Sequence, residues 1–416
     1  MKRIAVIGAG IAGMTAAYLL GRRHAVSLFE REPRLGGHTH TIRVASADGE
    51  VALDTGFLVH NDRTYPNLVR LFTELGIATR PSDMSFSVSC PSTGLEYSSR
   101  GALGFFAQPR NVVRIDHYRL LRDIVRFNRE APRVLTTPGA EEWTLGSFVA
   151  RERYGDAFTT QYLVPMTSAI WSASVDSMAA FPVQTLVRFM QNHGMLSVAS
   201  PIEWRVVNGG SDSYIAPMLA HLAEHIQLNA RVQSVSRSDR GVTVTFAGRL
   251  AADFDDVVFA CHGDQVLPLL ADPTAAEREV VGAFRTTVNE TVLHTDTRML
   301  PQSPRARASW NYLLGAAPDQ PPSVTYDLNR LQGISGRTTY CVTLNPRQPL
   351  DASKVIRRLE YRHPQFTRAS IGAQARWAEV SGVNRTHYCG AYWRYGFHED
   401  GVVSAQRVAH ALGVEW

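Results

Sequence analysis

The chain has 416 residues, more than one compact core of ordinary size holds, so its length predicts two lobes. Hydrophobic residues make up 44% of it and charged residues 19%, which excludes a disordered, collagen-like or coiled-coil protein. The net charge is +5, and nearly all of the 43 basic residues are arginines. An overall basic charge does not by itself indicate a nucleic-acid partner, and we expect none.

The cysteines and the N-terminal run exclude further classes. The four cysteines form no CxxC pair and no Cys/His cluster, so we expect neither a disulfide framework nor a metal site. They are Cys90, Cys261, Cys341 and Cys389. Glycines interrupt the N-terminal apolar run early, and no stretch reaches the roughly 18 apolar residues of a membrane span. We expect a cytoplasmic protein.

The first third of the chain begins with a strand–helix–strand unit. Residues 3–8 read as a buried strand, 11–21 as a helix rich in Ala and Leu, and 25–29 as a second strand that ends on Glu30. Residues 84–100 alternate like a hairpin. Helical spacing follows over 116–133, through Leu120, Leu121, Ile124 and Phe127, and the helical region continues to about 192 with a break expected at Pro165.

The second half returns to an α/β pattern. A Gly-Gly turn at 209–210 precedes a helix that reaches about 224, and strands are expected at 226–229, 232–237, 242–246 and 256–261. Residues 282–350 read as β-rich, with an exposed helix start expected around Lys354. A strand end at 388–390 and a helix over 401–412 close the chain. We expect one nucleotide-binding lobe built from three separated segments and a second lobe formed by two insertions.

A glycine motif at the first turn predicts dinucleotide binding. Gly8-x-Gly10-x-x-Gly13 follows the first strand, and the helix then opens with Ile11 and Ala12. Glycines allow a tight turn and close approach of the pyrophosphate to the backbone, while the helix N-terminus faces the phosphate charge. Glu30, at the end of the next strand, can accept hydrogen bonds from the adenosine ribose.

A second glycine pair follows in Arg34-Leu-Gly36-Gly37-His38-Thr-His40-Thr41. This segment resembles the Arg-x-Gly-Gly-Arg-x-x-Ser/Thr motif of FAD enzymes of the amine-oxidase and desaturase superfamily. The chain departs from the pattern at His38, where these enzymes usually have arginine. The resemblance implies noncovalent FAD, with Arg31 beside Glu30 among the residues that bind it.

Four more segments carry the same resemblance. Asp54-Thr-Gly56 matches the motif before the flavin-facing backbone, and Asn208-Gly209-Gly210 matches the mid-chain glycine turn. Val232 stands where these enzymes contact adenine. The closing motif is matched by Cys389-Gly390-Ala391 and by Gly401-Val402, which precede the last helix.

The resemblance implies an α/β fold: a Rossmann-like FAD-binding domain of the glutathione-reductase type with an inserted, amine-oxidase-like α+β substrate domain. We expect residues 1–80, 205–283 and 376–416 to form the FAD-binding domain. Residues 81–204 and 284–375 form the expected substrate domain.

The resemblance also implies hydride transfer from a C–H bond to flavin N5. Amine oxidases of this type place a lysine near N5, but Lys2 begins the first strand and Lys354 lies at an expected exposed helix start. Cys389 does not precede the closing motif as a covalent flavin cysteine would. His294, on a strand that enters the substrate lobe, is a candidate to hold a water or act as a base, with a hydrogen-bonded structural role as the alternative.

Aromatic residues in the insertions and the C-terminal loop favour an apolar substrate, plausibly a fatty-acyl chain or a related lipid. Trp393 and Tyr395 are also candidate catalytic residues, because the two rings together could form an aromatic cage for an amine. Tyr361-Arg-His363-Pro364 resembles a bacterial branch of FAD proteins that we associate with branched and cyclopropane fatty acids. The alternatives are an amine oxidase that forms imine and peroxide, and a flavin-binding protein without catalysis.

Residues 100–133 hold eight arginines against three acids. The helix expected there, with Phe105 and Phe106 before it, has the composition of a helix that lies on a membrane surface. The alternative is a helix whose apolar side covers the substrate lobe. We therefore expect a small apolar substrate, oxygen or a quinone-type carrier as electron acceptor, and peripheral contact with the inner membrane through this segment.

Overall fold

The structure is a computed structural model that describes residues 1–46, 49–196, 202–315 and 320–416. Its centre is a parallel sheet with the strand order β10-β2-β1-β14-β20. These strands are β10 (Ile226–Gln227), β2 (Ala25–Phe29), β1 (Arg3–Ile7), β14 (Asp256–Phe259) and β20 (Thr386–Tyr388). The expected strand–helix–strand unit is β1, α1 (Ile11–Leu20) and β2. All residues of β14 are buried, as is usual for a parallel strand covered on both faces.

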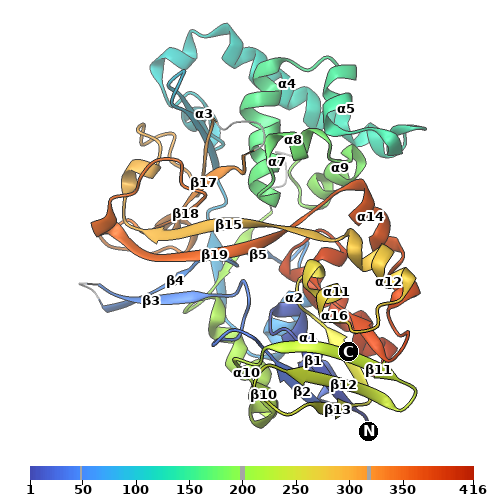
Figure 1. Cartoon of the computed structure of the whole chain (residues 1–416). Coiled ribbons are helices and arrows are strands. Elements are labelled where there is room, and N and C mark those ends of the chain that lie inside the picture. Colours follow the sequence, from blue (N-terminus) through green and yellow to red (C-terminus); the bar gives the residue numbers. More distant parts are fainter. Residues whose placement is uncertain (47–48, 197–201, 316–319) are drawn as a thin grey trace.

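A second, seven-stranded sheet has the order β19-β15-β18-β17-β16-β7-β8. Its strands are β19 (Val355–Gln365), β15 (Arg285–His294), β18 (Cys341–Leu344), β17 (Ser323–Asp327), β16 (Trp310–Leu313), β7 (Phe86–Cys90) and β8 (Leu95–Ser98). The long antiparallel pair β15 and β19 crosses the molecule between the parallel sheet and the upper helices (Figure 1).

The structure also contains three smaller sheets. They are β11 (Val232–Ser238), β12 (Gly241–Phe246) and β13 (Ala252–Phe254); β3 (Thr41–Ser46) and β4 (Gly49–Asp54); and β5 (His60–Asn61), β9 (Trp204–Val207) and β6 (Thr79–Ser82).

The longer helices cover the sheets and form an upper lobe. They are α2 (Pro66–Glu74), α3 (Gly101–Phe105), α4 (Ile115–Glu130), α5 (Leu145–Arg151), α7 (Val164–Trp171), α8 (Val175–Ala179), α9 (Val183–Asn192), α10 (Ile215–Leu219), α11 (Gly263–Leu269), α12 (Ala275–Val280), α14 (Arg368–Ala375) and α16 (His398–Ala411). The short ones are α6 (Asp156–Phe158), α13 (Leu328–Leu331) and α15 (Trp377–Val380). In the described ranges, no helix has the length and apolar character needed to cross a bilayer.

Three apolar clusters fill the interior. The largest surrounds the parallel sheet and draws on the beginning, middle and end of the chain, the second lies among α4 to α9, and the third lies against the seven-stranded sheet. The parallel sheet takes strands from each of the three segments expected to form the FAD-binding domain. On these grounds we keep the expected division into two domains as a proposal.

Candidate cofactor-binding and active site

Two positions of the turn between β1 and α1, Gly8 and Gly13, leave no room for a side chain. Gly8 has a φ of +103°, and a Cβ on it would lie 2.9 Å from the carbonyl carbon of Ala260. A Cβ on Gly13 would lie 1.8 Å from the Gly8 oxygen. A Cβ on Gly10 would meet nothing within 4 Å. The turn is therefore packed on one side and open on the side of the helix N-terminus, the arrangement that accepts a phosphate group.

Glu30 lies at the edge of this turn. Its carboxylate accepts hydrogen bonds from Ala9 N at 2.7 Å and Glu32 N at 3.0 Å. Ala230 N donates to the Glu30 carbonyl at 2.8 Å, which brings the residues just before Val232 to this place. Arg31 instead is exposed and forms an ion pair with Glu32 at 3.2 Å. Val232 therefore lies two residues from a direct backbone partner of Glu30, near enough for both to serve an adenosine site.

The second glycine pair packs directly on the first turn. Gly36 N donates to the Ala9 carbonyl at 2.9 Å, and a Cβ on Gly37 would lie 3.0 Å from the Gly10 Cα. The Arg34 guanidinium donates to the carbonyls of Leu35 and Thr39 at 3.3 Å each and of Gly37 at 2.8 Å. Arg34 therefore holds the loop in shape through its backbone.

Thr41 has a structural partner. Its hydroxyl donates to Asp54 Oδ1 at 2.6 Å, and the same oxygen accepts from the backbone N and hydroxyl of Ser211 at 2.8 and 2.9 Å. Burial raises the pKa of Asp54 to about 6. A Cβ on Gly56 would lie 2.2 Å from the His38 oxygen, so residues 54–56 pack tightly against the second glycine loop.

The start of α16 reaches the start of α1. A Cβ on Gly401 would lie 2.7 Å from Ile11 Cγ2, so glycine is what lets the two helix N-termini approach. Gly390 N donates to Ser404 Oγ at 3.1 Å, and Val402 is fully buried in the core of the parallel sheet. Two helix N-termini and two glycine loops therefore converge at the carboxyl ends of β1, β2, β14 and β20, where open α/β sheets bind their ligands.

Three histidines, His38, His262 and His363, gather beside these loops; we call them the histidine group. The His38 ring stacks on His363 at 5.2 Å and lies 5.8 Å from His262. Burial lowers the pKa of His262 and of His363 to about 4, and that of His38 well below its usual value. All three rings are thus neutral near pH 7. Within the described residues no group of acidic, Cys or His side chains is arranged to hold a metal ion.

His294 lies elsewhere. Thr287, not His294, is the residue of β15 that pairs with His363 on β19. His294 lies seven residues after Thr287, which is roughly 23 Å along an extended strand. Its Nδ1 accepts from Asp296 N at 3.0 Å, its Nε2 bonds Thr343 Oγ1 at 2.7 Å, and the side chain is fully buried. This geometry does not bring His294 to the histidine group.

The expected aromatic cage does not form, because Trp393 and Tyr395 pack into different cores. Trp393 is buried around the parallel sheet, with its ring 4.7 Å from Phe284. Tyr395 packs in the helical lobe, 5.7 Å from Phe189. An amine would find no pair of facing rings at these two positions.

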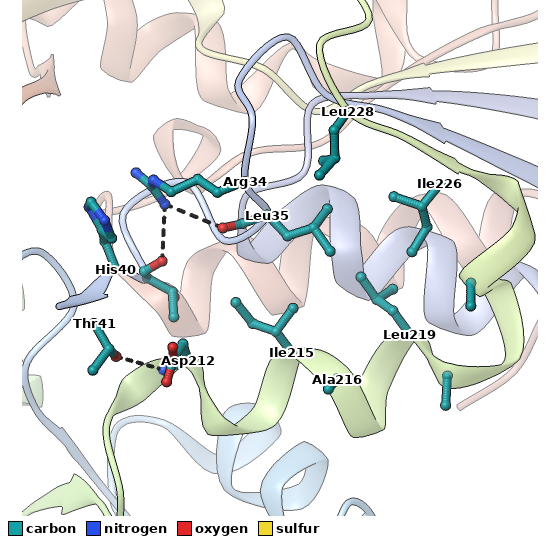
Figure 2. A pocket seen from close by; sticks show the side chains of 13 residues that line it. Arg34, Leu35, His40, Thr41, Asp212, Ile215, Ala216, Leu219, Ile226 and Leu228 are labelled. Atoms are coloured by element: carbon teal, nitrogen blue, oxygen red, sulfur yellow. Dashed lines mark hydrogen bonds between the residues drawn. The ribbon is translucent and has the colours of Figure 1, made fainter. Parts of the chain in front are cut away.

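A cavity of about 570 Å³ opens between the second glycine loop and α10 (Figure 2). Arg34, His40 and Asp212 lie at its polar end. Its remaining walls are largely apolar and include Leu35, Ile215, Leu219, Ile226 and Leu228. The glycine turn and the histidine group do not line it.

Comparison with known proteins identifies the family. The profile of flavin containing amine oxidoreductases matches residues 11–349. The chain belongs to this family. FAD, expected from the glycine loops, is therefore the cofactor of the chain, and the buried turn, Glu30 and the paired helix N-termini fit its ADP portion.

Individual relatives are distant. The AofH protein of Mycobacterium tuberculosis, assigned by name to the flavin-containing monoamine oxidases, is 28% identical over 249 residues, which cover 58% of this chain and 53% of that protein. The match thus spans about half the length of this curated relative.

Solved structures share the whole fold. Cyclohexylamine oxidase from Brevibacterium oxydans aligns with a TM-score of 0.69 at 14% identity, covering 99% of this chain and 98% of the other. A CLA-producing fatty acid isomerase from P. acnes aligns with a TM-score of 0.68 at 14% identity, covering 99% of both chains. The fold is therefore the predicted one, a Rossmann-like FAD domain with a substrate domain.

We expect FAD to be released by acid precipitation. Cys389 is fully buried, and the four cysteines are all free thiols. Acid unfolds the cradle, so a noncovalent flavin should appear in the supernatant, measured by its absorbance. Yellow colour that stays in the pellet would contradict noncovalent binding.

Proposed function

We propose that this chain oxidises a C–H bond of an apolar small molecule, such as a fatty-acyl chain or related lipid, in a desaturase-like reaction. The observation that carries the proposal is an aromatic cluster that leads from the cofactor cradle into the helical lobe. Phe57 stacks on His398 at 3.7 Å at the start of α16, and Phe397, the preceding residue, stacks on Phe189 of α9 at 5.2 Å. Trp171 of α7 lies 4.8 Å from Phe189.

The titratable neighbours of this cluster favour an uncharged substrate. Burial lowers the pKa of His193, which stacks on Phe189, to about 4, and that of His398 well below its ordinary value.

The two lysines of the chain lie elsewhere. Lys2 forms an ion pair with Asp256 at 2.8 Å at the amino-terminal ends of β1 and β14, and Lys354 is exposed beside Asp351. Neither lysine can take the place that lysine has in the amine oxidases.

The glycine loops would hold a flavin, which would supply a hydride acceptor and a route for two electrons to oxygen or a quinone-type carrier. The chain supplies the rest. The glycine loops and Glu30 bind the cofactor, the aromatic cluster orients an apolar substrate and excludes water, and the neutral histidines offer hydrogen bonds without adding charge.

An amine oxidase is the alternative, and the family name favours it. An aerobic peroxide assay with primary amines, polyamines and long-chain acyl substrates separates the two activities. We expect no peroxide from amines above the rate without substrate. Rapid peroxide formation with simple amines would replace our proposal by the alternative. Failure of every compound to reduce the bound flavin in the absence of oxygen would favour a non-catalytic flavoprotein.

A surface in the helical lobe supports contact with a membrane. Among the described residues, the majority of the exposed large hydrophobic side chains lie on α3, on the turn before α4 and on α4 itself. This apolar patch consists of Leu103, Val112, Val113, Ile115, Tyr118 and Val125. Val113 is 80% exposed and Ile115 69%. In the view of Figure 1 the patch elements lie at the end of the molecule away from β1 and β2.

Arginines surround the patch. The side chains of Arg119, Arg122 and Arg129 are 64, 68 and 71% exposed, and each forms an ion pair, with Asp116 at 3.1 Å, Asp123 at 2.9 Å and Glu130 at 2.7 Å respectively. Exposed Asp116 and half-buried Glu130 offset part of this charge. Apolar side chains ringed by arginine fit an anionic lipid surface, to which each arginine adds about 1 kcal/mol of attraction. We infer that the patch docks peripherally on an anionic bilayer.

The residues involved differ from those expected. Leu120 and Phe127 are buried in the helical lobe, and Phe105 stacks on His117 at 4.1 Å. Of the four apolar residues expected on one side of α4, Leu120 and Phe127 thus cover the core, Ile124 is partly buried against it, and Leu121 is exposed. Phe105 and Phe106 are only partly exposed and make ring contacts with each other.

We expect the double variant Val113→Ser/Ile115→Ser to bind anionic vesicles about tenfold more weakly than wild type, because two exposed apolar side chains are lost. Cosedimentation with phosphatidylglycerol and phosphatidylcholine vesicles across a salt series measures this. The matched control is Leu250→Ser, which is 92% exposed on the turn between β12 and β13. Wild type that ignores anionic vesicles at low salt would overturn the inference, as would a dimer that the double variant dissociates in the absence of lipid.

A further inference from the structure

Two asparagines behind His363 determine which of its ring nitrogens carries the proton. Asn345 Oδ1 accepts from Glu290 N at 3.1 Å, and its Nδ2 donates to the Pro322 carbonyl at 3.1 Å. These backbone partners fix the orientation of the Asn345 amide, because a backbone N–H can only donate and a carbonyl can only accept.

The orientation of the Asn345 amide determines the orientation of the Asn289 amide. Asn345 Nδ2 donates to Asn289 Oδ1 at 2.8 Å, so the Asn289 amide nitrogen is the atom left to face His363. Asn289 Nδ2 donates to His363 Nδ1 at 2.9 Å. Asn289 is fully buried, which makes a lost or reversed hydrogen bond costly.

His363 Nδ1 is thus an acceptor, and the neutral ring carries its proton on Nε2. In the part of the chain that the structure describes, His363 Nε2 has no hydrogen-bond partner, although the ring stacks on His38 beside the second glycine loop. The rings of His38 and His262 also make no hydrogen bond within the described residues, so what sets His363 apart is that Asn289 fixes which of its nitrogens is the donor.

We propose that Asn345 and Asn289 hold His363 as a fixed Nε2–H donor to the bound flavin. The proposal rests on the proposed function for its cofactor but not for its substrate. Asn289 is a positioning residue that acts through His363. A hydrogen bond donated to the flavin favours its electron-rich reduced form, so the donor raises the tendency of the flavin to take electrons from a poorly reactive C–H bond.

The surroundings of His363 support a neutral ring. His38 and His262 face it from the second glycine loop and from the end of β14. Arg34 lies beyond His38, and Arg362 pairs with Asp264 at 3.6 Å near His262. Burial, and after it the charge of His262, lower the pKa of His363 to about 4, and the ring gains charge only as the pH falls toward that value.

Asn289→Asp provides the sharpest test, because a carboxylate only accepts hydrogen bonds. His363 Nδ1 must then carry a proton, Nε2 becomes an acceptor in the neutral ring, and the pKa of His363 rises. ¹⁵N NMR of the histidine rings reports the tautomer directly, with His363→Gln identifying the signal. His294 serves as an internal reference, since its Nδ1 also accepts a backbone N–H and Asn289→Asp leaves it untouched.

We expect the Nε2–H tautomer of His363 in wild type, with and without FAD, and a protonated Nδ1 in Asn289→Asp. We also expect the variant flavin to be harder to reduce by about tenfold in equilibrium constant, which is roughly 30 mV for two electrons. Asn289→Leu, which removes the bond without adding charge, should show a mixture of tautomers.

An Nδ1–H tautomer in wild type would overturn the proposal even if no variant folds. An unchanged potential in a folded Asn289→Asp variant that has switched tautomer would also overturn it. Failure of lipid substrates to reduce the flavin would count against the proposed function alone, since neither the tautomer nor the potential requires a substrate.

Discussion

Replacing Gly10 by valine should abolish tight FAD binding and leave the fold intact. A Cβ at Gly10 meets no protein atom within 4 Å, and the residue has an ordinary φ of −74°, so the protein itself tolerates a side chain. The same side chain would occupy the open side of the turn, where a phosphate must approach the N-terminus of α1. Loss of two backbone hydrogen bonds to charged phosphate oxygens should weaken FAD binding by about 100-fold or more.

Titration of the apoprotein with FAD, followed by quenching of flavin fluorescence, measures this loss. The matched control is Gly372→Val on α14, where an added Cβ also meets nothing within 4 Å. We expect the control to bind FAD like wild type. A Gly10→Val protein with wild-type affinity would mean that the phosphate does not lie at this turn.

Replacing Arg237 by methionine should destabilise the protein by roughly 3–5 kcal/mol, because it leaves the buried carboxylate of Glu277 without its cation. Arg237 on β11 forms an ion pair with Glu277 on α12 at 2.5 Å, and both side chains are 2% exposed. Tyr388 on β20 donates to the same carboxylate at 2.5 Å. This network ties the middle of the chain to its C-terminal segment.

Chemical denaturation followed by tryptophan fluorescence gives the free energy of unfolding. Arg376→Met is the control, since Arg376 pairs with Glu279 and Glu379 on the surface, where ion pairs contribute little. Equal effects of the two substitutions would show that the three segments do not depend on this network to form one lobe.

Local patterns predicted the parallel sheet well. β1, α1 and β2 are short, strongly apolar and separated by glycine or polar turns, so their sequence pattern allowed only one interpretation. Pro165 was the misleading signal. It stands in the first turn of α7, after a π-helical turn at Thr159–Leu163, where its missing N–H is not needed. The helical path therefore continues where a break was predicted.

Strand β19 was missed because its first residues look helical. Ala352–Lys354 forms one 3-10 turn, and the chain then runs as a strand from Val355 to Gln365. This strand carries His363 to the cradle. The sequence offers no local signal for that placement, because the pairing of β15 with β19 joins residues more than 60 positions apart.

The cofactor loops were predictable and the histidine group was not. Glycine positions follow from backbone geometry that is local to each turn, whereas His363 lies on the missed strand β19 and no local signal distinguishes it from His294. One signal was available: Thr287, Asn289 and Thr291 alternate along β15 and so share one face of the strand. Asn289 and Thr291 are fully buried, and a buried polar face on a strand needs polar partners.

Anaerobic reduction of the bound flavin by candidate substrates tests the central claim most directly. The protein, loaded with FAD, is mixed without oxygen with fatty acids and acyl lipids and, separately, with amines, and loss of the flavin absorbance is followed with mass analysis of the products. The account predicts bleaching by an apolar substrate that loses two hydrogens per flavin, and no bleaching by simple amines. Bleaching by amines alone, with imine as the product, would contradict it.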